Sequence, residues 1–200
     1  MKLKNILIAV AMLAVSVSAS AQSKGWNQVS LQYNPMSMAT DGHAWIFGGT
    51  MDDINVNAFS AVYTRGISIT PSQPLYFVPG LGVQYSNYDD DGDEVNVWSA
   101  KVPLSLLYRF EVTDSKIAFE PNLGFDLRYN ISGDATLNGI DGDMFSDLDC
   151  SRFQFGWHIG MNITYDKYLF EFSYGTDLTK FHDKVDKKFS IVTVGLGYRF

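Results

Sequence analysis

Residues 189–200 read Phe-Ser-Ile-Val-Thr-Val-Gly-Leu-Gly-Tyr-Arg-Phe and end the chain. From Val192 onward every second residue is apolar, and the residues between them are small or polar. A period of two residues is typical of a β-strand with one apolar and one polar face. The length also matches the roughly 9–11 residues that a tilted strand needs to cross a bilayer. We therefore predict that this strand, which ends on an aromatic residue, closes a barrel.

The same alternation recurs in seven earlier segments of the chain. The connections between them alternate between long polar segments and short turns, which is typical of an outer-membrane barrel with short periplasmic turns. The predicted fold is all-β, an eight-stranded antiparallel up-and-down transmembrane β-barrel with both chain ends on the periplasmic side. The predicted strands are 26–33, 56–69, 75–85, 97–110, 117–131, 153–165, 168–176 and 189–200.

The apolar faces of these strands hold more large side chains than one small barrel can enclose. The interior of an eight-stranded barrel is only just wide enough for its inward side chains. A soluble barrel of the lipocalin type, with its apolar face inside, is therefore the less favoured alternative. We expect the apolar side chains to face lipid and the polar, glycine-rich face to line the lumen.

The second strand, residues 56–69, is the least regular, because Arg65 falls on its apolar face. Either the guanidinium group reaches along the strand towards the headgroups, or a bulge at Gly66 changes the register. The sequence leaves both alternatives open.

Residues 1–21 have the composition of a cleaved signal peptide. A basic start precedes a short apolar run, and an Ala-Ser-Ala cleavage signal ends the segment. The barrel domain is therefore predicted to span residues 22–200 and to be exported to the outer membrane.

The cysteine count and the net charge limit what the protein can form and bind. Cys150 is the only cysteine, so an intramolecular disulfide is excluded. The formal net charge of −7, with no basic cluster, argues against binding to nucleic acid.

The polar faces of the strands include charged residues of both signs. Buried charges must be paired or hydrated, so we favour a salt-bridged plug inside the barrel. A selective path for a small solute or a proton is the alternative, although an eight-stranded barrel leaves little bore. The residues assigned to this lumen charge network are Lys101, Arg109, Glu120, Asp126, Arg128, Arg152, His158, Glu171 and Arg199.

Two acidic segments, residues 89–94 and 132–151, are predicted to be loops. The first offers Asp89, Asp91 and Asp93 as weak candidates for a metal site, because carboxylates are ligands of Ca²⁺. Their spacing does not fit the helix-loop-helix calcium pattern, so a solvated loop is the favoured interpretation. Weak bridging by divalent cations to lipid headgroups or to another protein is the alternative. No cofactor is expected.

The histidines give little support to catalysis. Acyl hydrolysis needs a nucleophile within hydrogen-bond reach of a histidine base, near the membrane surface. His158 is predicted to point into the lumen, and His43 and His182 lie in predicted loops. No such pair is evident on a lipid-facing strand end, so we expect no enzymatic activity and no zinc site. A lipid-modifying barrel enzyme is kept as a further alternative.

Three tryptophans, Trp26, Trp98 and Trp157, lie near predicted strand ends together with several tyrosines. Aromatic girdles at the two membrane interfaces are typical of outer-membrane barrels. We therefore expect these tryptophans on the outer surface.

Four segments support a resemblance to a known family. They are 121–129 (Pro-Asn-Leu-Gly-Phe-Asp-Leu-Arg-Tyr), 155–161 (Phe-Gly-Trp-His-Ile-Gly-Met), 172–178 (Phe-Ser-Tyr-Gly-Thr-Asp-Leu) and 195–200 (Gly-Leu-Gly-Tyr-Arg-Phe). Over residues 75–200 the chain resembles the PorT-like outer-membrane β-barrel domain family of Bacteroidota. The resemblance implies insertion by the barrel-assembly machinery through the terminal strand, with Tyr198 and Phe200 as the assembly signal. It brings no catalytic motif, and some relatives serve in protein secretion and gliding.

The expected function is a structural or protein-interaction role in the cell envelope. The expected partners are outer-membrane lipid and envelope or secretion proteins that bind through the acidic loops. Porin-like passage of small solutes is the alternative.

Overall fold

The computed structural model describes residues 25–38, 54–90, 93–137, 139–146, 150–180 and 188–200. The predicted signal peptide, His43, His182 and Asp91 lie outside these ranges. Within the ranges, no helix has both the length and the apolar character to cross a membrane.

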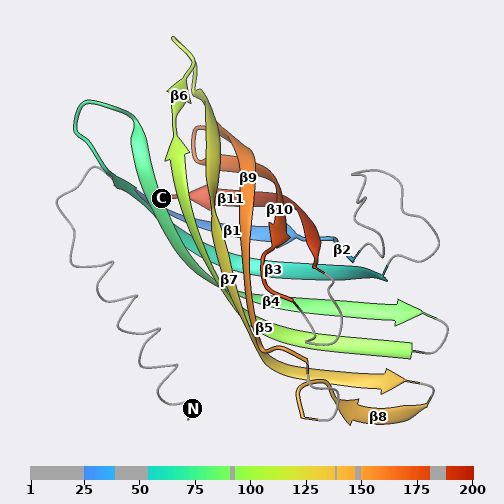
Figure 1. The fold of residues 1–200 in the computed structure, drawn as a ribbon. Helices are drawn as coiled ribbons and strands as arrows, with labels where there is room; N and C mark the ends of the chain where they lie inside the picture. Colours follow the sequence, from blue (N-terminus) through green and yellow to red (C-terminus); the bar gives the residue numbers. More distant parts are fainter. Residues whose placement is uncertain (1–24, 39–53, 91–92, 138, 147–149, 181–187) are drawn as a thin grey trace.

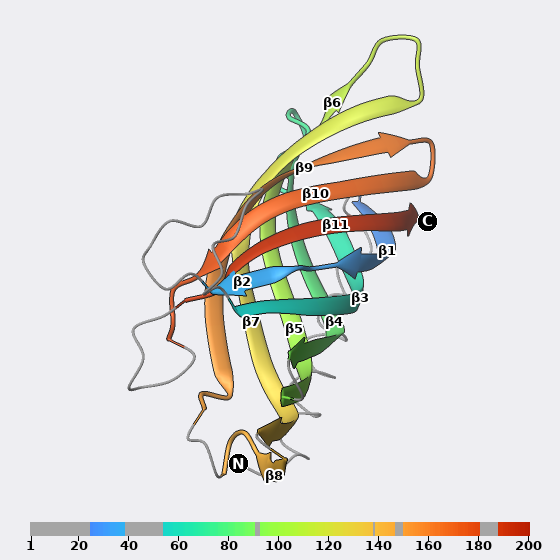
Figure 2. The same cartoon turned by 90° about the vertical axis from the view of Figure 1, so that its right-hand side faces the viewer.

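The described residues form one antiparallel sheet that closes on itself. β1 pairs with both β11 and β3, and the other long strands each pair with two neighbours (Figure 1; Figure 2 shows β11 between β10 and β1). The short strand β2 continues β1, while β6 and β8 pair with β7. Eight long strands form the wall, which confirms the predicted eight-stranded barrel. The strands are β1 (Gly25–Tyr33), β2 (Met36–Met38), β3 (Ile54–Ser68), β4 (Leu75–Asp90), β5 (Asp93–Tyr108), β6 (Phe110–Glu111), β7 (Ile117–Leu137), β8 (Ile140–Asp143), β9 (Phe153–Tyr165), β10 (Tyr168–Asp177) and β11 (Ser190–Arg199).

The period of two in each strand decides which side chains face outward. Leu31 and its cross-strand partner Leu196 are 71% and 68% exposed, whereas Gln28 and Gln84 are buried. Because the exposed positions are the apolar ones, the wall is apolar outside and polar inside. The prediction that the apolar face points outward is correct.

The second strand keeps one register through its irregular stretch. Thr64 pairs with Gly80 and Ile67 with Phe77 in the same alignment, so β3 and β4 have no bulge at Gly66. Arg65 therefore stays on the outer face, close to the end where Gly25 and Phe200 lie, and the alternative of a shifted register is wrong.

Trp26 lies inside the barrel, which corrects the expectation that it belongs to an outer girdle. Its ring packs on Gly66, where a Cβ atom would come within 2.2 Å of Cε2 of the indole. Trp26 has the same parity along β1 as Gln28, and this parity places both side chains in the lumen. Trp98, by contrast, lies on the outer face, 52% exposed and packed against Tyr85.

The acidic segments are largely strand, so their prediction as loops is wrong. β4 extends to Asp90, and β5 begins at Asp93. β7 is 21 residues long, whereas β10 has 10 residues. The last residue of β7 paired with β9 is Tyr129, and at ~3.4 Å per residue the part beyond it is about 25 Å long. β4, β5, β7 and β8 therefore project past the barrel at the end opposite Gly25 and Phe200 (Figure 1). We call this part the projecting sheet, residues 86–90, 93–98, 132–137 and 140–143.

A bulge and a small apolar cluster shape the projecting sheet. Trp98 pairs with Ser132 but Ser99 pairs with Asn130, so Ile131 is an extra residue in β7. Beyond the bulge a cluster of buried side chains gives the projecting sheet a core of its own. Its members are Val97, Ala135 and Met144, with Val95, Phe145 and Cys150 packed against them.

Candidate functional site in the barrel lumen

The lumen is closed near the end with Gly25 and Phe200 by one carboxylate with two guanidinium partners. Glu120 of β7 is completely buried. Its Oε1 accepts bonds from Nη1 of Arg109 at 2.9 Å and from Nη1 of Arg199 at 2.8 Å. The Arg199 guanidinium also stacks on Trp26, 3.7 Å from the ring centroid. Two cations on one carboxylate, covered by an indole ring, fill this end of the barrel.

Two glutamines connect this cluster to the middle of the lumen. Gln28 and Gln32 each donate a 2.8 Å hydrogen bond to Glu171. Gln28 accepts a bond from Arg199 at 3.0 Å, and Gln32 accepts one from Lys101 at 3.3 Å. The amides therefore link the charged side chains into one chain of hydrogen bonds, as buried charges require.

A separate ion pair fills the lumen towards the projecting sheet. Nη2 of Arg128 lies 2.6 Å from Oδ1 of Asp177, and both side chains are buried. The same nitrogen, Nη2 of Arg128, also contacts Oδ2 of Asp177, so one guanidinium nitrogen bridges both carboxylate oxygens. Nη1 of Arg128 lies 3.0 Å from Sδ of Met36, so this end is closed by a polar pair beside an apolar side chain.

Three strands bring a serine, a histidine and an aspartate into one line. Ser105 of β5 lies 2.9 Å from Nε2 of His158 of β9, measured from Oγ. Nδ1 of the same ring lies 2.6 Å from Oδ2 of Asp126 of β7. The sequence predicted Asp126 and His158 as members of the lumen charge network, but it did not predict that Ser105 contacts His158.

A cavity of about 90 Å³ lies beside these groups. Its walls include Ser105, His158, Asn122 and Asn162, together with Glu171 from the linked network. That volume admits several water molecules. The interior is therefore filled by side chains except for a small polar space.

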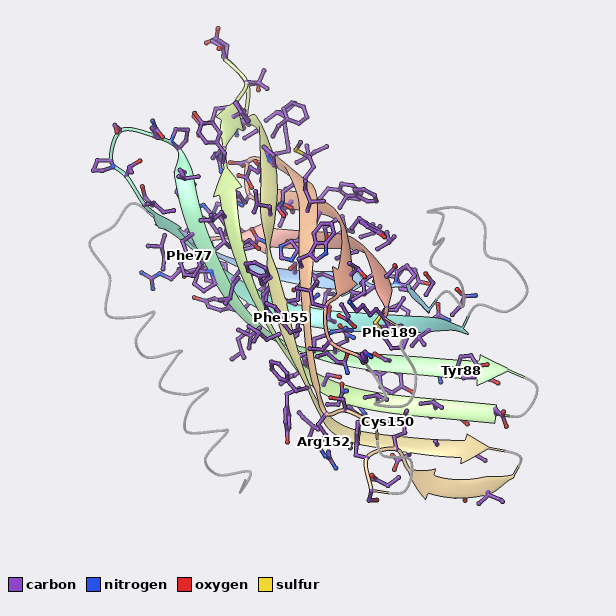
Figure 3. All side chains as sticks on the ribbon, in the orientation of Figure 1. Phe77, Tyr88, Cys150, Arg152, Phe155 and Phe189 are labelled. Atoms are coloured by element: carbon purple, nitrogen blue, oxygen red, sulfur yellow. The ribbon has the colours of Figure 1, made fainter. Side chains whose placement is uncertain are left out.

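Arg152 does not belong to the lumen network, which corrects its assignment. Its Nη1 donates to the backbone oxygens of Asn130 and Ile131 at 3.3 and 2.9 Å. Its guanidinium lies over the ring of Phe145, 4.3 Å from the centroid. Figure 3 shows Arg152 beside Cys150 at the projecting end, outside the run of β9. The residue precedes the strand, so the alternation of β9 does not decide where it points.

The carboxylates proposed as weak metal candidates do not converge in the described residues. Asp89 pairs with Glu94, while Asp93 pairs with Asp90. Cross-strand partners share a face and successive residues alternate, so Asp89 and Asp93 point to opposite faces of the hairpin. In the part of the chain that the structure describes, no group of three or more His, Cys, Asp or Glu side chains could hold a metal ion.

The sequence reasoning missed four lumen residues that make essential contacts: Gln28, Gln32, Ser105 and Asp177. Each lies on the inward parity of its strand, and the alternation places Gln28, Gln32 and Ser105 on the polar face without showing what they contact. Asp177 was missed because the seventh strand was predicted to end one residue early. The other three are neutral, whereas the predicted lumen network was made of titratable side chains alone.

The proposed assembly signal lies on the closing strand. Phe200 exchanges two backbone hydrogen bonds with Asn27 of β1, at 2.8 and 3.1 Å. Tyr198 is on the outer face and contacts Tyr168, with ring centroids 5.8 Å apart. The role of Tyr198 and Phe200 in assembly stays a prediction.

Solved structures with the same architecture include two outer-membrane proteins. One is Ail, the attachment invasion locus protein of Yersinia pestis, in complex with the heparin analogue sucrose octasulfate. It is 13% identical, with a TM-score of 0.50 over 88% of this chain and 99% of that one. The other is the outer membrane enzyme PagL, 10% identical, with a TM-score of 0.53 over 86% of this chain and 98% of that one. Likeness at this level of identity shows the fold alone.

Family membership rests on the sequence itself. No curated protein sequence matches the chain. The sequence profile described as "Outer membrane protein beta-barrel domain" matches residues 7–200, which is nearly the whole chain. Together with the apolar outer wall, this match places the protein in the outer membrane. The chain belongs to the outer membrane protein beta-barrel domain family.

Proposed function

We propose that this protein is an interaction protein of the outer membrane and that it binds its partner through the projecting sheet. The observation that supports this most directly is the free edge of β8. Among the described residues β8 pairs with β7 alone. An unpaired edge presents backbone N–H and C=O groups to which another extended segment can add.

The filled lumen supports an interaction role over the passage of solutes. Glu120 with its two arginines fills one end, and the Arg128–Asp177 pair fills the other. The cavity of about 90 Å³ between them is far smaller than a continuous channel would be. Porin-like passage is therefore the less favoured function.

The side chains at this edge indicate the chemistry of the partner. Ile140 is 74% exposed, and Asp141 follows it in β8. Asp134 of β7 lies directly across from Asp143 of β8. An extended segment with basic side chains and one apolar side chain for Ile140 would complement this edge. The same carboxylates disfavour a polyanion such as the heparin analogue bound to the Yersinia pestis protein.

The setting that we propose is a protein assembly of the cell envelope. The resemblance to the PorT-like family suggests a secretion assembly, and residues 1–21 would direct export. In this arrangement the short turns face the periplasm and the projecting sheet faces the outside.

Photo-crosslinking in intact cells tests the proposal. A photoreactive amino acid at Ile140 should give a discrete protein adduct, and Asp141→Lys should weaken it. Phe110, which is 54% exposed near the opposite end, is the matched position, and Glu111→Lys is the matched charge reversal there. The same adducts from Ile140 and Phe110, or lipid adducts alone at Ile140, would contradict the proposal.

A further inference from the structure

We propose that Ser105 is an activated nucleophile and that the lumen cavity is a hydrolytic site for small carboxylic esters. The hydrogen-bonded line Ser105–His158–Asp126 has the connectivity that activates serine in hydrolases: nucleophile, histidine base, and a carboxylate on the other ring nitrogen. This inference goes beyond the proposed interaction role and does not depend on it.

The sheet builds this line at adjacent positions. Ser105 and His158 are both cross-strand partners of Gly124, on its two sides. The missing side chain of Gly124 lets them meet, since a Cβ atom there would lie 3.0 Å from Cε1 of His158. Asp126 is two residues further along β7, on the same inward face, where it reaches Nδ1 of the ring. Rigid strands therefore hold all three groups, which favours a fixed geometry over an incidental contact.

The partners of His158 define which ring nitrogen carries the proton in the neutral imidazole. The Asp126 carboxylate only accepts hydrogen bonds, so Nδ1 of His158 is the nitrogen that carries the proton. Nε2 is then free to accept the proton of Ser105, at a separation of 2.9 Å from Oγ. This arrangement is the one in which histidine acts as a general base.

The chemistry needs only water as co-reactant. Oγ of Ser105 attacks the ester carbonyl as Nε2 of His158 takes its proton. The C–O bond of the ester then breaks, and the alcohol leaves with that proton. Water attacks the acyl-serine through the same base, which releases the acid and restores the serine hydroxyl. The products are one carboxylic acid and one alcohol.

The cavity around Ser105 limits the size of the substrate, and its polar lining can stabilise the negative charge that develops on the ester oxygen. The cavity of about 90 Å³ admits an acetyl-sized group rather than a lipid acyl chain. Asn162 lines it, and its amide nitrogen offers an N–H donor for a developing oxyanion. The amide nitrogen of Asn122 donates to the Glu120 carbonyl at 3.3 Å and to Oδ1 of Asn162 at 3.2 Å, and so holds the Asn162 side chain in place. The side chains of His158 and Asp126 are 11% and 19% exposed, so the line is in contact with the cavity.

This inference departs from the expectation of no enzymatic activity. That expectation rested on lipid-facing strand ends, where no serine–histidine pair is evident. The Ser105–His158–Asp126 line lies inside the barrel, and Asp126 and Ser105 are 32 and 53 residues from His158 in sequence.

The test is hydrolysis of p-nitrophenyl acetate by the purified, folded barrel. We expect release of p-nitrophenolate above the buffer rate and an acetyl group on Ser105, located by peptide mass spectrometry. Ser105→Ala should reduce the rate to background, and His158→Ala should lower it by about 10²-fold or more. Ser99→Ala is the matched control, because Ser99 is a buried serine on the same inward face of β5 but is not among the residues that line the cavity.

Asp126 is a positioning residue and needs a separate test. Asp126→Asn should lose most of the rate, and Asp126→Glu, which keeps a carboxylate for Nδ1, should restore part of it. Heat-modifiable mobility in SDS gels, that is, a difference in migration between unboiled and boiled samples, checks that each variant is a folded barrel. The proposal is overturned if the wild-type rate equals that of Ser105→Ala, or if acetyl groups appear only on other residues.

Discussion

At the scale of single residues, Glu120 determines how one end of the lumen is filled. It is completely buried, and both of its oxygens bind arginine. A buried carboxylate of this kind is stable only with its partners, and the partners need it equally. Arg109 also pairs with Glu111, which is 73% exposed. One arginine thus provides a buried and an exposed ion pair for comparison.

Removing the buried charge should cost far more stability than removing the exposed one. Glu120→Gln leaves two guanidinium groups in the lumen without their carboxylate, and we expect a loss of about 3–5 kcal/mol in the free energy of unfolding. Glu111→Gln should cost about 1 kcal/mol or less, because water screens that pair. Urea unfolding in lipid vesicles measures both, and equal losses would contradict the assigned burial.

Asp143 lies outside the membrane-spanning part and makes the stability of its turn depend on pH. Backbone N–H groups of Ser146 and Phe145 donate to its Oδ1, each at 2.8 Å, and they hold the pKa of Asp143 below its usual range. Because the folded pKa is depressed, the stabilisation of this turn is present above the unfolded pKa of about 3.9. It is lost as the pH falls through the lower folded pKa.

Amide hydrogen exchange measures this effect. Protection factors of Phe145 and Ser146 should be constant from neutral pH to about pH 4 and should fall below it. Asp143→Ala should lower them at neutral pH as well. Protection that is independent of both pH and Asp143 would contradict the capping role.

Single residues also show how far the sequence could predict the site. Glu120, Lys101 and Asp126 were assigned to the lumen from parity alone, and the structure places them there. Ser105 was missed because its role depends on the close approach of β5 and β9 across Gly124. Arg152 was misplaced because it lies outside the alternation of its strand.

At the scale of strands, β7 contains both the transmembrane wall and the projecting sheet. Its lipid-facing side chains include Phe125 near the middle of the wall and Phe119 near the end with Gly25 and Phe200. Phe125 also stacks on Phe155, with ring centroids 5.4 Å apart. Depth in the bilayer is the main difference between the two positions.

The cost of a charge should follow that depth. We expect Phe125→Arg to destabilise the barrel by about 2–4 kcal/mol, and Phe119→Arg by about 0–1 kcal/mol, because arginine near an interface can reach the headgroups. Unfolding in vesicles of defined thickness measures both values. A neutral Phe125→Arg would mean that this face does not contact lipid.

The sequence pattern predicted each of the eight wall strands, but it did not predict where the strands of the projecting sheet end. Alternation identified all eight wall strands, because lipid on one side and a packed lumen on the other impose it. Above the barrel no lipid selects apolar side chains, so Asp89 and Asp134 give no strand signal. Cross-strand pairing and the cluster around Met144 stabilise that region instead, and these contacts are not local in sequence.

At the scale of the whole molecule, the barrel is a filled cylinder with an asymmetric sheet at one end. The wall determines the location of the protein, and the ion pairs near the two ends of the lumen leave no continuous channel among the described residues. The projecting sheet extends past the barrel at the end opposite Gly25 and Phe200 (Figures 1 and 2). The volume argument from sequence succeeded here because it depends on side-chain size and not on particular contacts.

Planar-bilayer conductance of the pure, folded barrel tests the central claim, that the lumen is closed by its own charged side chains. The account predicts a bilayer without steady currents at moderate voltage. Steady, reproducible open-channel currents from the pure protein would contradict it, and would favour passage of solutes as the function.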